Sequence, residues 1–166
     1  RAGFVALAAA LPQAPEGGFQ AETALAVLDG ALDELINCDA TDAASLGVLA
    51  FGAGAAYGLR TAARNRRVAA VVACDGPLEG DALGDATLSA VRAPLLWILG
   101  AEDEVLADGR ARACEERLSQ ADVPVRLCVQ PGARRGFSNE AHADVFDAAA
   151  VAAAWDLTLA FLAAEL

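Results

Sequence analysis

The sequence predicts an α/β fold whose mainly parallel sheet is covered by helices on both faces. Three observations support this: short apolar runs, amphipathic segments between them, and a composition of 56% apolar and 21% charged residues in a chain of 166. This length suits one domain with one sizeable core. Continuous apolar runs indicate strands that are buried on both faces, which is typical of parallel sheets.

The first half of the chain contains two predicted strands, each followed by a helix. Apolar runs closed by proline or glycine indicate buried strands, and leucines at helical spacing opposite acidic residues indicate an amphipathic helix. The predicted elements are a strand over Gly3–Leu11, a loop over Pro12–Gly18, a helix over Ala21–Ile36, a strand over Leu46–Phe51, a turn at Gly52–Gly54 and a helix over Ala55–Asn65.

The second half repeats this alternation. Asp75-Gly76-Pro77 ends the third apolar run, and Gly100 ends the fourth. The predicted elements are a strand over Val68–Cys74, a short helix or loop over Ala82–Val91, a strand over Pro94–Leu99, a helix over Gly109–Gln120, a strand over Val123–Val129, a loop over Pro131–Phe137 and a closing helix over Ala148–Leu166.

Charge and composition argue against several classes of protein. The net charge of −11 makes a nucleic-acid partner improbable, because an acidic surface repels phosphates. No membrane span is expected, since Asp156 and Glu165 interrupt the longest apolar stretch. Four scattered cysteines and one histidine make a metal site improbable, and no cofactor is expected. The scattered cysteines suit free thiols in an intracellular, reducing compartment. No signal peptide is visible, and the first residue, Arg1, indicates a processed start or a piece of a longer chain.

The ends of the predicted strands are where a ligand is expected, because parallel α/β sheets bind ligands at the carboxyl edge. A dinucleotide site at Gly52–Gly54 is rejected, since the third glycine of G-x-G-x-x-G is replaced by Tyr57. The strand-end segments are Phe51-Gly52-Ala53-Gly54, Cys74-Asp75, Gly100-Ala101-Glu102-Asp103 and Pro131-Gly132-Ala133-Arg134-Arg135-Gly136-Phe137.

The order of these segments resembles the dienelactone hydrolase family, a branch of the α/β-hydrolases. GFVALAAALP resembles a family strand, LGVLAFGAGAA the nucleophile turn, and APLLWILGAEDEVL the strand and loop that carry the acid. VQPGARRGFSN resembles the family's Y-P-G-A-x-H-G-F, and AWDLTLAFLAAEL resembles its last helix. The resemblance covers nearly the whole chain and implies an α/β-hydrolase fold that acts on esters or lactones.

The resemblance also implies that the catalytic triad is incomplete. The family's acid falls on Asp103, its nucleophile on Gly52 and its histidine on Arg135. Glycine has no nucleophile, and a guanidinium group stays protonated at neutral pH and cannot accept a proton. Since triad members act as a unit, we expect a pseudoenzyme that serves as a structural or binding subunit. Glycine at position 52 still allows the sharp turn.

Several alternatives stay open at this point. Gly52–Gly54 can be an ordinary turn between a strand and a helix. Catalysis can have moved to Cys74 and His142 with Asp103, although Cys74 also suits a core position and His142 a solvated loop. Arg134 and Arg135 can contact an anionic ligand in the vacated pocket, or can point to water. We predict an ion pair between Asp103 and Arg135.

The resemblance further predicts that the chain, residues 1–166, is the C-terminal two-thirds of one domain that lacks its N-terminal strands. In that fold another strand lies between Gly3–Leu11 and Leu46–Phe51. Buried strand edges without partners are costly. We therefore expect an upstream segment or a protein partner to complete the sheet.

Overall fold

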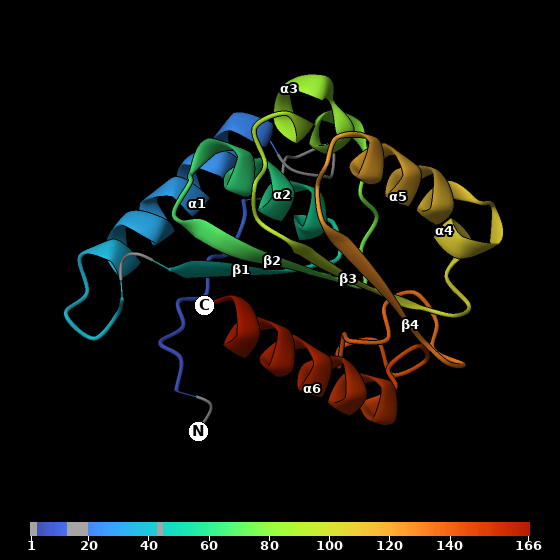
Figure 1. Cartoon of the computed structure of the whole chain (residues 1–166). Coiled ribbons are helices and arrows are strands. Elements are labelled where there is room, and N and C mark those ends of the chain that lie inside the picture. The colour runs from blue at the N-terminus through green and yellow to red at the C-terminus, as the bar shows by residue number, and fades with distance from the viewer. Residues whose placement is uncertain (1–2, 13–19, 43–44) are drawn as a thin grey trace.

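The protein, described by a computed structural model, is a parallel sheet with unequal helical cover on its two faces (Figure 1). The structure describes residues 3–12, 20–42 and 45–166. The sheet has the order β1-β2-β3-β4 and every pair is parallel. Its strands are β1 (Leu46–Phe51), β2 (Val68–Cys74), β3 (Leu95–Gly100) and β4 (Val125–Gln130).

The helices of the chain lie between and after these strands. They are α1 (Ala21–Ile36), α2 (Gly54–Arg64), a 3-10 turn η1 (Gly80–Leu83), α3 (Asp85–Leu88), α4 (Glu104–Ala107), α5 (Arg110–Gln120) and α6 (Ala148–Glu165). All but α6 lie on one side of the sheet, and α6 lies alone on the other (Figure 1). We call these sides the multi-helix face and the α6 face.

Alternation along the central strands produces two separate cores. Successive side chains of a strand point to opposite faces, so Val71 and Trp97 pack on the multi-helix face, whereas Val72 and Ile98 pack on the α6 face. All four are completely buried. The Trp97 indole also donates a 2.9 Å hydrogen bond to the Gly76 carbonyl. Both cores therefore share the same two central strands.

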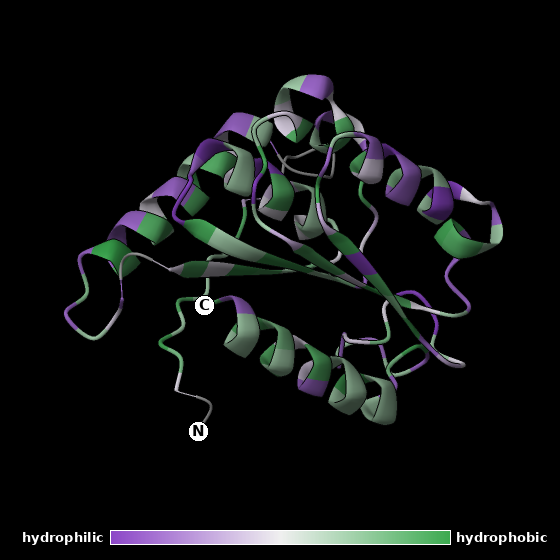
Figure 2. Cartoon of the chain, viewed as in Figure 1, coloured by the Kyte–Doolittle hydropathy of each residue, from purple (hydrophilic) through white to green (hydrophobic). Residues whose placement is uncertain are grey.

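Helix α6 is mostly apolar, as its largely green colour shows, with Asp156 and Glu165 as its charged residues (Figure 2). Ala150, Ala154 and Thr158 are its buried residues, while Trp155 is 49% exposed. By length and composition alone, α6 is long and apolar enough to cross a membrane. Contrary to the expectation from the sequence, Asp156 and Glu165 do not rule this out. One such helix is a weak indication, and 17% of its most apolar stretch is buried inside the molecule.

The expected strand at Gly3–Leu11 is wrong. No strand is present over residues 3–12, and Phe4, Val5 and Leu7 are exposed. An apolar run becomes a strand only where another strand can pair with it, and β1 pairs only with β2 in the described chain. The loop expected over Pro12–Gly18 lies outside the described residues apart from Pro12. The other predicted elements are present, with shifts of a few residues at their ends.

Candidate functional site

Four segments meet at the carboxyl edge of the sheet, where parallel α/β folds place their ligand sites. Gly52 follows β1, Asp75 follows β2, Asp103 lies just beyond β3, and the loop 131–139 follows β4. Hydrogen bonds between the segments hold this edge together. The Asp75 amide donates to the Ile98 carbonyl at 2.8 Å.

The turn after β1 has the geometry that the sequence predicts. Gly52 has a φ of +53°, which glycine adopts without strain, and its amide donates to the Cys74 carbonyl at 3.0 Å. A Cβ built at this position would meet no atom within 4 Å, so a side chain there would enter open space. Gly76 is the reverse case, because its Cβ would lie 1.8 Å from the Gly52 carbonyl oxygen. The turn is tight from the side of β2 and open toward the pocket.

Asp103 is buried at the start of α4. Its Oδ1 accepts a 2.9 Å hydrogen bond from the Val105 amide and caps the helix. Its Oδ2 is buried and has no hydrogen-bond partner in the described structure. The position that the sequence resemblance assigns to the acid therefore holds a carboxylate with one oxygen uncommitted.

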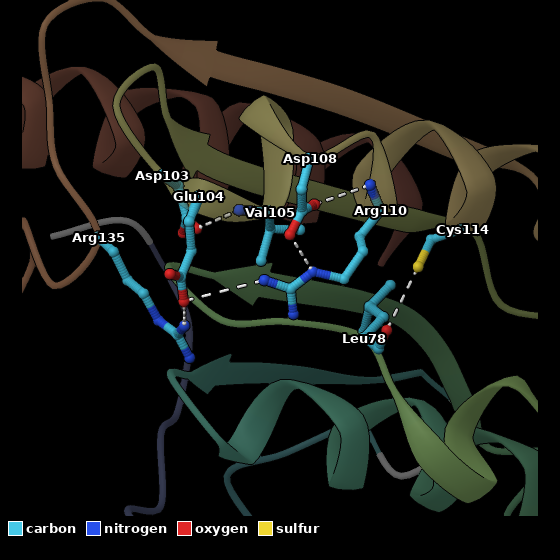
Figure 3. A network of polar contacts seen from close by, with 8 residues as sticks. All are labelled: Leu78, Asp103, Glu104, Val105, Asp108, Arg110, Cys114 and Arg135. Atoms are coloured by element: carbon cyan, nitrogen blue, oxygen red, sulfur yellow. Dashed lines mark hydrogen bonds and ion pairs between the residues drawn. The ribbon is translucent and has the colours of Figure 1, made fainter.

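The predicted ion pair between Asp103 and Arg135 is wrong. Arg135 Nη1 instead lies 2.8 Å from Oε1 of Glu104, the residue that follows Asp103 (Figure 3). Both of those side chains are about half exposed or more, whereas Asp103 is 1% exposed. Pairing with Glu104 leaves the guanidinium group in contact with water. Pairing with Asp103 would remove the group from water, which costs on the order of several kcal/mol for a buried ion.

Arg134 likewise pairs at the surface rather than pointing freely to water. Its Nε lies 3.4 Å from Glu102 Oε2, and both side chains are more than half exposed. The two arginines thus pair with glutamates of the loop that follows β3. Exposed pairs of this kind contribute little to stability, about 0–1 kcal/mol each.

Asp75 belongs to one of the strand-end segments that the sequence points to, but the sequence assigns it no role in the site. Its Oδ1 accepts from the Gly136 amide at 2.7 Å, and its Oδ2 accepts from the Ser138 amide at 3.2 Å and the Ser138 hydroxyl at 3.0 Å. Burial raises the pKa of Asp75 above 3.8 and outweighs these three hydrogen bonds, which lower it. The residue has a φ of +59°, uncommon outside glycine. Its carboxylate clamps the loop after β4 to the end of β2.

Cys74 and His142 are not assembled as a relocated catalytic pair. Cys74 is buried on the α6 face, and burial, with a smaller effect of Asp75, raises the pKa of its thiol to about 12. His142 is exposed, and its amide donates to Asn139. No hydrogen bond joins the two side chains in the described part of the chain. A thiol with such a pKa is almost wholly protonated at neutral pH and is a poor nucleophile.

A pocket of about 530 Å³ opens at this edge. Gly52, Asp75 and Arg135 are among the residues that line it, but neither Asp103 nor Cys74 is. Ser138 and Asn139 also line it, and nothing in the sequence pattern singled them out. Among the described residues, no group of three His, Cys, Asp or Glu side chains is placed to hold a metal ion. The lining residues are Phe51, Gly52, Asp75, Arg135, Gly136, Ser138 and Asn139.

Comparison with known proteins settles the family. The family model of the dienelactone hydrolases matches residues 13–166. The chain belongs to the dienelactone hydrolase family. None of the curated proteins matches it in sequence at a significant level.

Solved structures show that the fold is that of this family and of the α/β-hydrolases. A dienelactone hydrolase from Anabaena variabilis is 24% identical, with a TM-score of 0.68 over 89% of this chain and 62% of that chain. The dienelactone hydrolase-like promiscuous phosphotriesterase P91 from metagenomic libraries is 19% identical, with a TM-score of 0.73 over 85% of this chain and 61% of that chain. The chain therefore spans less than two thirds of these relatives' length.

Proposed function

We propose that this dienelactone hydrolase family member is non-catalytic and serves as a binding or structural domain. The observation that carries the proposal is the pair of residues at the two reactive positions. Gly52 offers only a hydrogen where the nucleophile would be, and Arg135 is ion-paired with Glu104 where the base would be. A guanidinium group has no free lone pair with which to accept a proton. Acyl transfer at this turn therefore has neither an attacking atom nor a proton acceptor.

Turnover of an activated ester tests the proposal. Purified protein is incubated with 4-nitrophenyl acetate, and release of nitrophenolate is followed beside intact-mass spectrometry. We expect the rate of the buffer alone and no acetyl adduct. A stoichiometric adduct on Cys74, lost in Cys74→Ala, would instead support the alternative of a relocated hydrolase that uses Cys74 and His142.

Two variants show whether the assay can detect chemistry in this pocket. Gly52→Ser adds a hydroxyl in open space, and Arg135→His restores a base at the family's histidine position, while Asp103 Oδ2 remains an uncommitted acceptor. The double variant is expected to form an acetyl adduct on the introduced hydroxyl, whereas each single variant is not, because triad members act together. Ser138 also carries a hydroxyl group and lines this pocket. Turnover by the wild-type protein that is abolished by Ser138→Ala would contradict the proposal.

Binding of a small molecule in the vacated pocket is a second candidate function. The cavity of about 530 Å³ is within the usual size of ligand sites, and Asp75 and the half-exposed Arg135 are among its lining residues. Thermal shift against a panel of small acids and amines, with Arg135→Gln as the variant, tests this. A shift that persists unchanged in Arg135→Gln would place the ligand elsewhere.

A segment upstream in a longer chain, or a partner protein, is proposed to complete the sheet beside β1. Phe51 is 51% exposed, and three apolar side chains near the start of the chain are also exposed. The relatives' additional length supports an intramolecular segment. Size-exclusion chromatography of this chain with and without its neighbouring sequence tests this proposal.

An intracellular, reducing compartment is also proposed. The four free thiols support it.

A further inference from the structure

A second pocket lies away from the family's reactive positions, between the segment after β2 and helix α5. Its volume is about 380 Å³, and it shares no lining residue with the pocket at Gly52. The walls are mostly apolar, which favours a ligand with an apolar body. The residues that form these walls are Pro77, Leu78, Leu83, Val105, Ala113 and Cys114.

One face of α5 forms the floor of this second pocket. Arg110, Ala113, Cys114 and Arg117 recur at helical spacing, so they lie on the same side of the helix. Ala113 is small and leaves space between α5 and the segment opposite. The Cys114 thiol donates to the Leu78 carbonyl at 3.3 Å and fixes that segment (Figure 3). Burial raises the pKa of Cys114, so the thiol stays neutral and apolar.

Two arginines bring positive charge to this apolar space. Arg110 pairs with Asp108 at 2.6 Å and with Glu104 at 3.8 Å, and Arg117 pairs with Asp85. Both guanidinium groups are nearly half exposed, and the carboxylate partners Asp108, Glu104 and Asp85 are 45%, 68% and 90% exposed. Ion pairs at such positions contribute about 0–1 kcal/mol, so a carboxylate delivered by a ligand can replace the partner at little cost. Glu79 is the acid among the lining residues, and it is exposed.

We propose that this second pocket binds a small monocarboxylate with an aromatic or branched apolar body. The body occupies the space between Leu78, Leu83 and Ala113, and the carboxylate contacts Arg110 or Arg117. The apolar walls provide affinity through burial, and a charge-assisted hydrogen bond to a guanidinium group provides the preference for an acid over a neutral analogue. The proposal does not depend on whether the Gly52 pocket is catalytic.

Binding of 2-naphthoate tests the proposal, with 2-naphthamide as the neutral probe of the same shape. Calorimetry is expected to give one site per chain, with naphthoate bound about tenfold more tightly than the amide. Arg110→Gln combined with Arg117→Gln should weaken naphthoate about tenfold and leave the amide within about twofold. Arg112→Gln is the matched control, because Arg112 is on the same helix, is 84% exposed and lies outside the pocket.

Filling the pocket tests the apolar part of the site. Ala113→Leu should weaken both probes at least about tenfold, since its side chain occupies the volume that the ring needs. Ala113→Val is a milder filling variant if the leucine prevents folding. In the wild-type protein, naphthoate should shift NMR amide signals of residues 77–83 and 110–117.

Three results would overturn the proposal. They are no saturable binding of naphthoate at millimolar concentration, equal affinity for acid and amide in the wild type, or NMR shifts confined to residues 51–52 and 135–139. The last result would assign the ligand to the Gly52 pocket instead.

Discussion

The two faces of the sheet differ in how completely they are covered. On the multi-helix face, α1, α2 and α5 bury a continuous apolar cluster that includes Trp97 and Leu59. On the α6 face, a smaller cluster lies under one helix and the Phe137 side chain. Trp155 on α6 and Leu166, directly after α6, remain substantially exposed, as does Phe51 at the end of β1.

This difference indicates which face of the sheet needs no further cover. On the multi-helix face, helices of this chain bury the apolar residues of the sheet. The α6 face leaves Trp155 and Leu166 partly in water. We therefore place the proposed covering segment or partner on the α6 side and along β1, rather than over α5.

The two tryptophans give the largest expected contrast between the faces. Trp97→Ala removes a fully buried side chain and its hydrogen bond to Gly76, and should lower the free energy of unfolding by about 3–5 kcal/mol. Trp155→Ala removes a side chain that is 49% exposed and should cost less than about 1 kcal/mol. Urea unfolding followed by circular dichroism measures both. Equal costs would mean that Trp155 is covered in solution.

Asp75 tests how firmly the loop that leads into α6 is attached. Asp75→Asn replaces one carboxylate oxygen by an amide NH₂ that faces the donors of Gly136 or Ser138, and should cost about 1–3 kcal/mol. Asp144→Asn, an exposed change in the same loop, is the control and should be neutral within about 0.5 kcal/mol.

The pH dependence of stability gives a second measurement on Asp75. Because burial raises its pKa in the folded protein, the folded state binds more protons than the unfolded state just above pH 3.8. The contribution of Asp75 to stability is therefore full below pH 3.8 and is lost as the pH rises through the raised pKa. Asp75→Asn should remove that decline from a series of urea unfolding curves. An unchanged pH profile would show that Asp75 titrates normally.

The N-terminus of α6 provides a smaller effect. Asp147 caps this helix through hydrogen bonds to the amides of Ala149 and Ala150 at 2.9 and 3.0 Å. Asp147→Ala should lower the free energy of unfolding by about 1 kcal/mol, a typical value for loss of a cap. Thermal unfolding measures it, and Asp147→Ser should retain most of the stability. Full stability of the alanine variant would mean that α6 is held by its packing alone.

The labelling rates of the two buried thiols compare the two faces in the folded protein. Cys74 lies on the α6 face and Cys114 on the multi-helix face, and burial raises the pKa of both. At pH 8, iodoacetamide should therefore modify the half-buried Cys38 and Cys128 at least about tenfold faster. Peptide mass spectrometry gives the four rates. Rapid labelling of Cys74 alone would show that the α6 face opens in solution.

Much of the fold could be predicted from the sequence because its signals are local. The apolar run at Val68–Cys74 and the leucine spacing at Ala21–Ile36 give correct elements, since each pattern matches the period of its structure. Gly3–Leu11 shows the limit of this reasoning. Its apolar run is as clear as the others, but a strand depends on a pairing partner, which composition does not report.

The candidate site was predicted only in part for a similar reason. The positions of Gly52, Asp103 and Arg135 at the carboxyl edge follow from motif order, but the choice between Asp103 and Glu104 as the partner of Arg135 depends on burial. Asp75 carried one usable signal, a carboxylate directly after a fully apolar strand. Its actual role depends on amides some sixty residues later in the chain.

Arg135 and Glu104 also constrain how this domain can evolve if the proposed loss of catalysis is correct. A serine at position 52 without a base is inert, and a histidine at position 135 gives up the glutamate contact and has no nucleophile to serve. Neither single step offers an advantage on which natural selection could act. Under the proposal of a non-catalytic domain, ester hydrolysis at this turn would need both substitutions at once, and the ion pair of Arg135 with Glu104 would be lost in the same step.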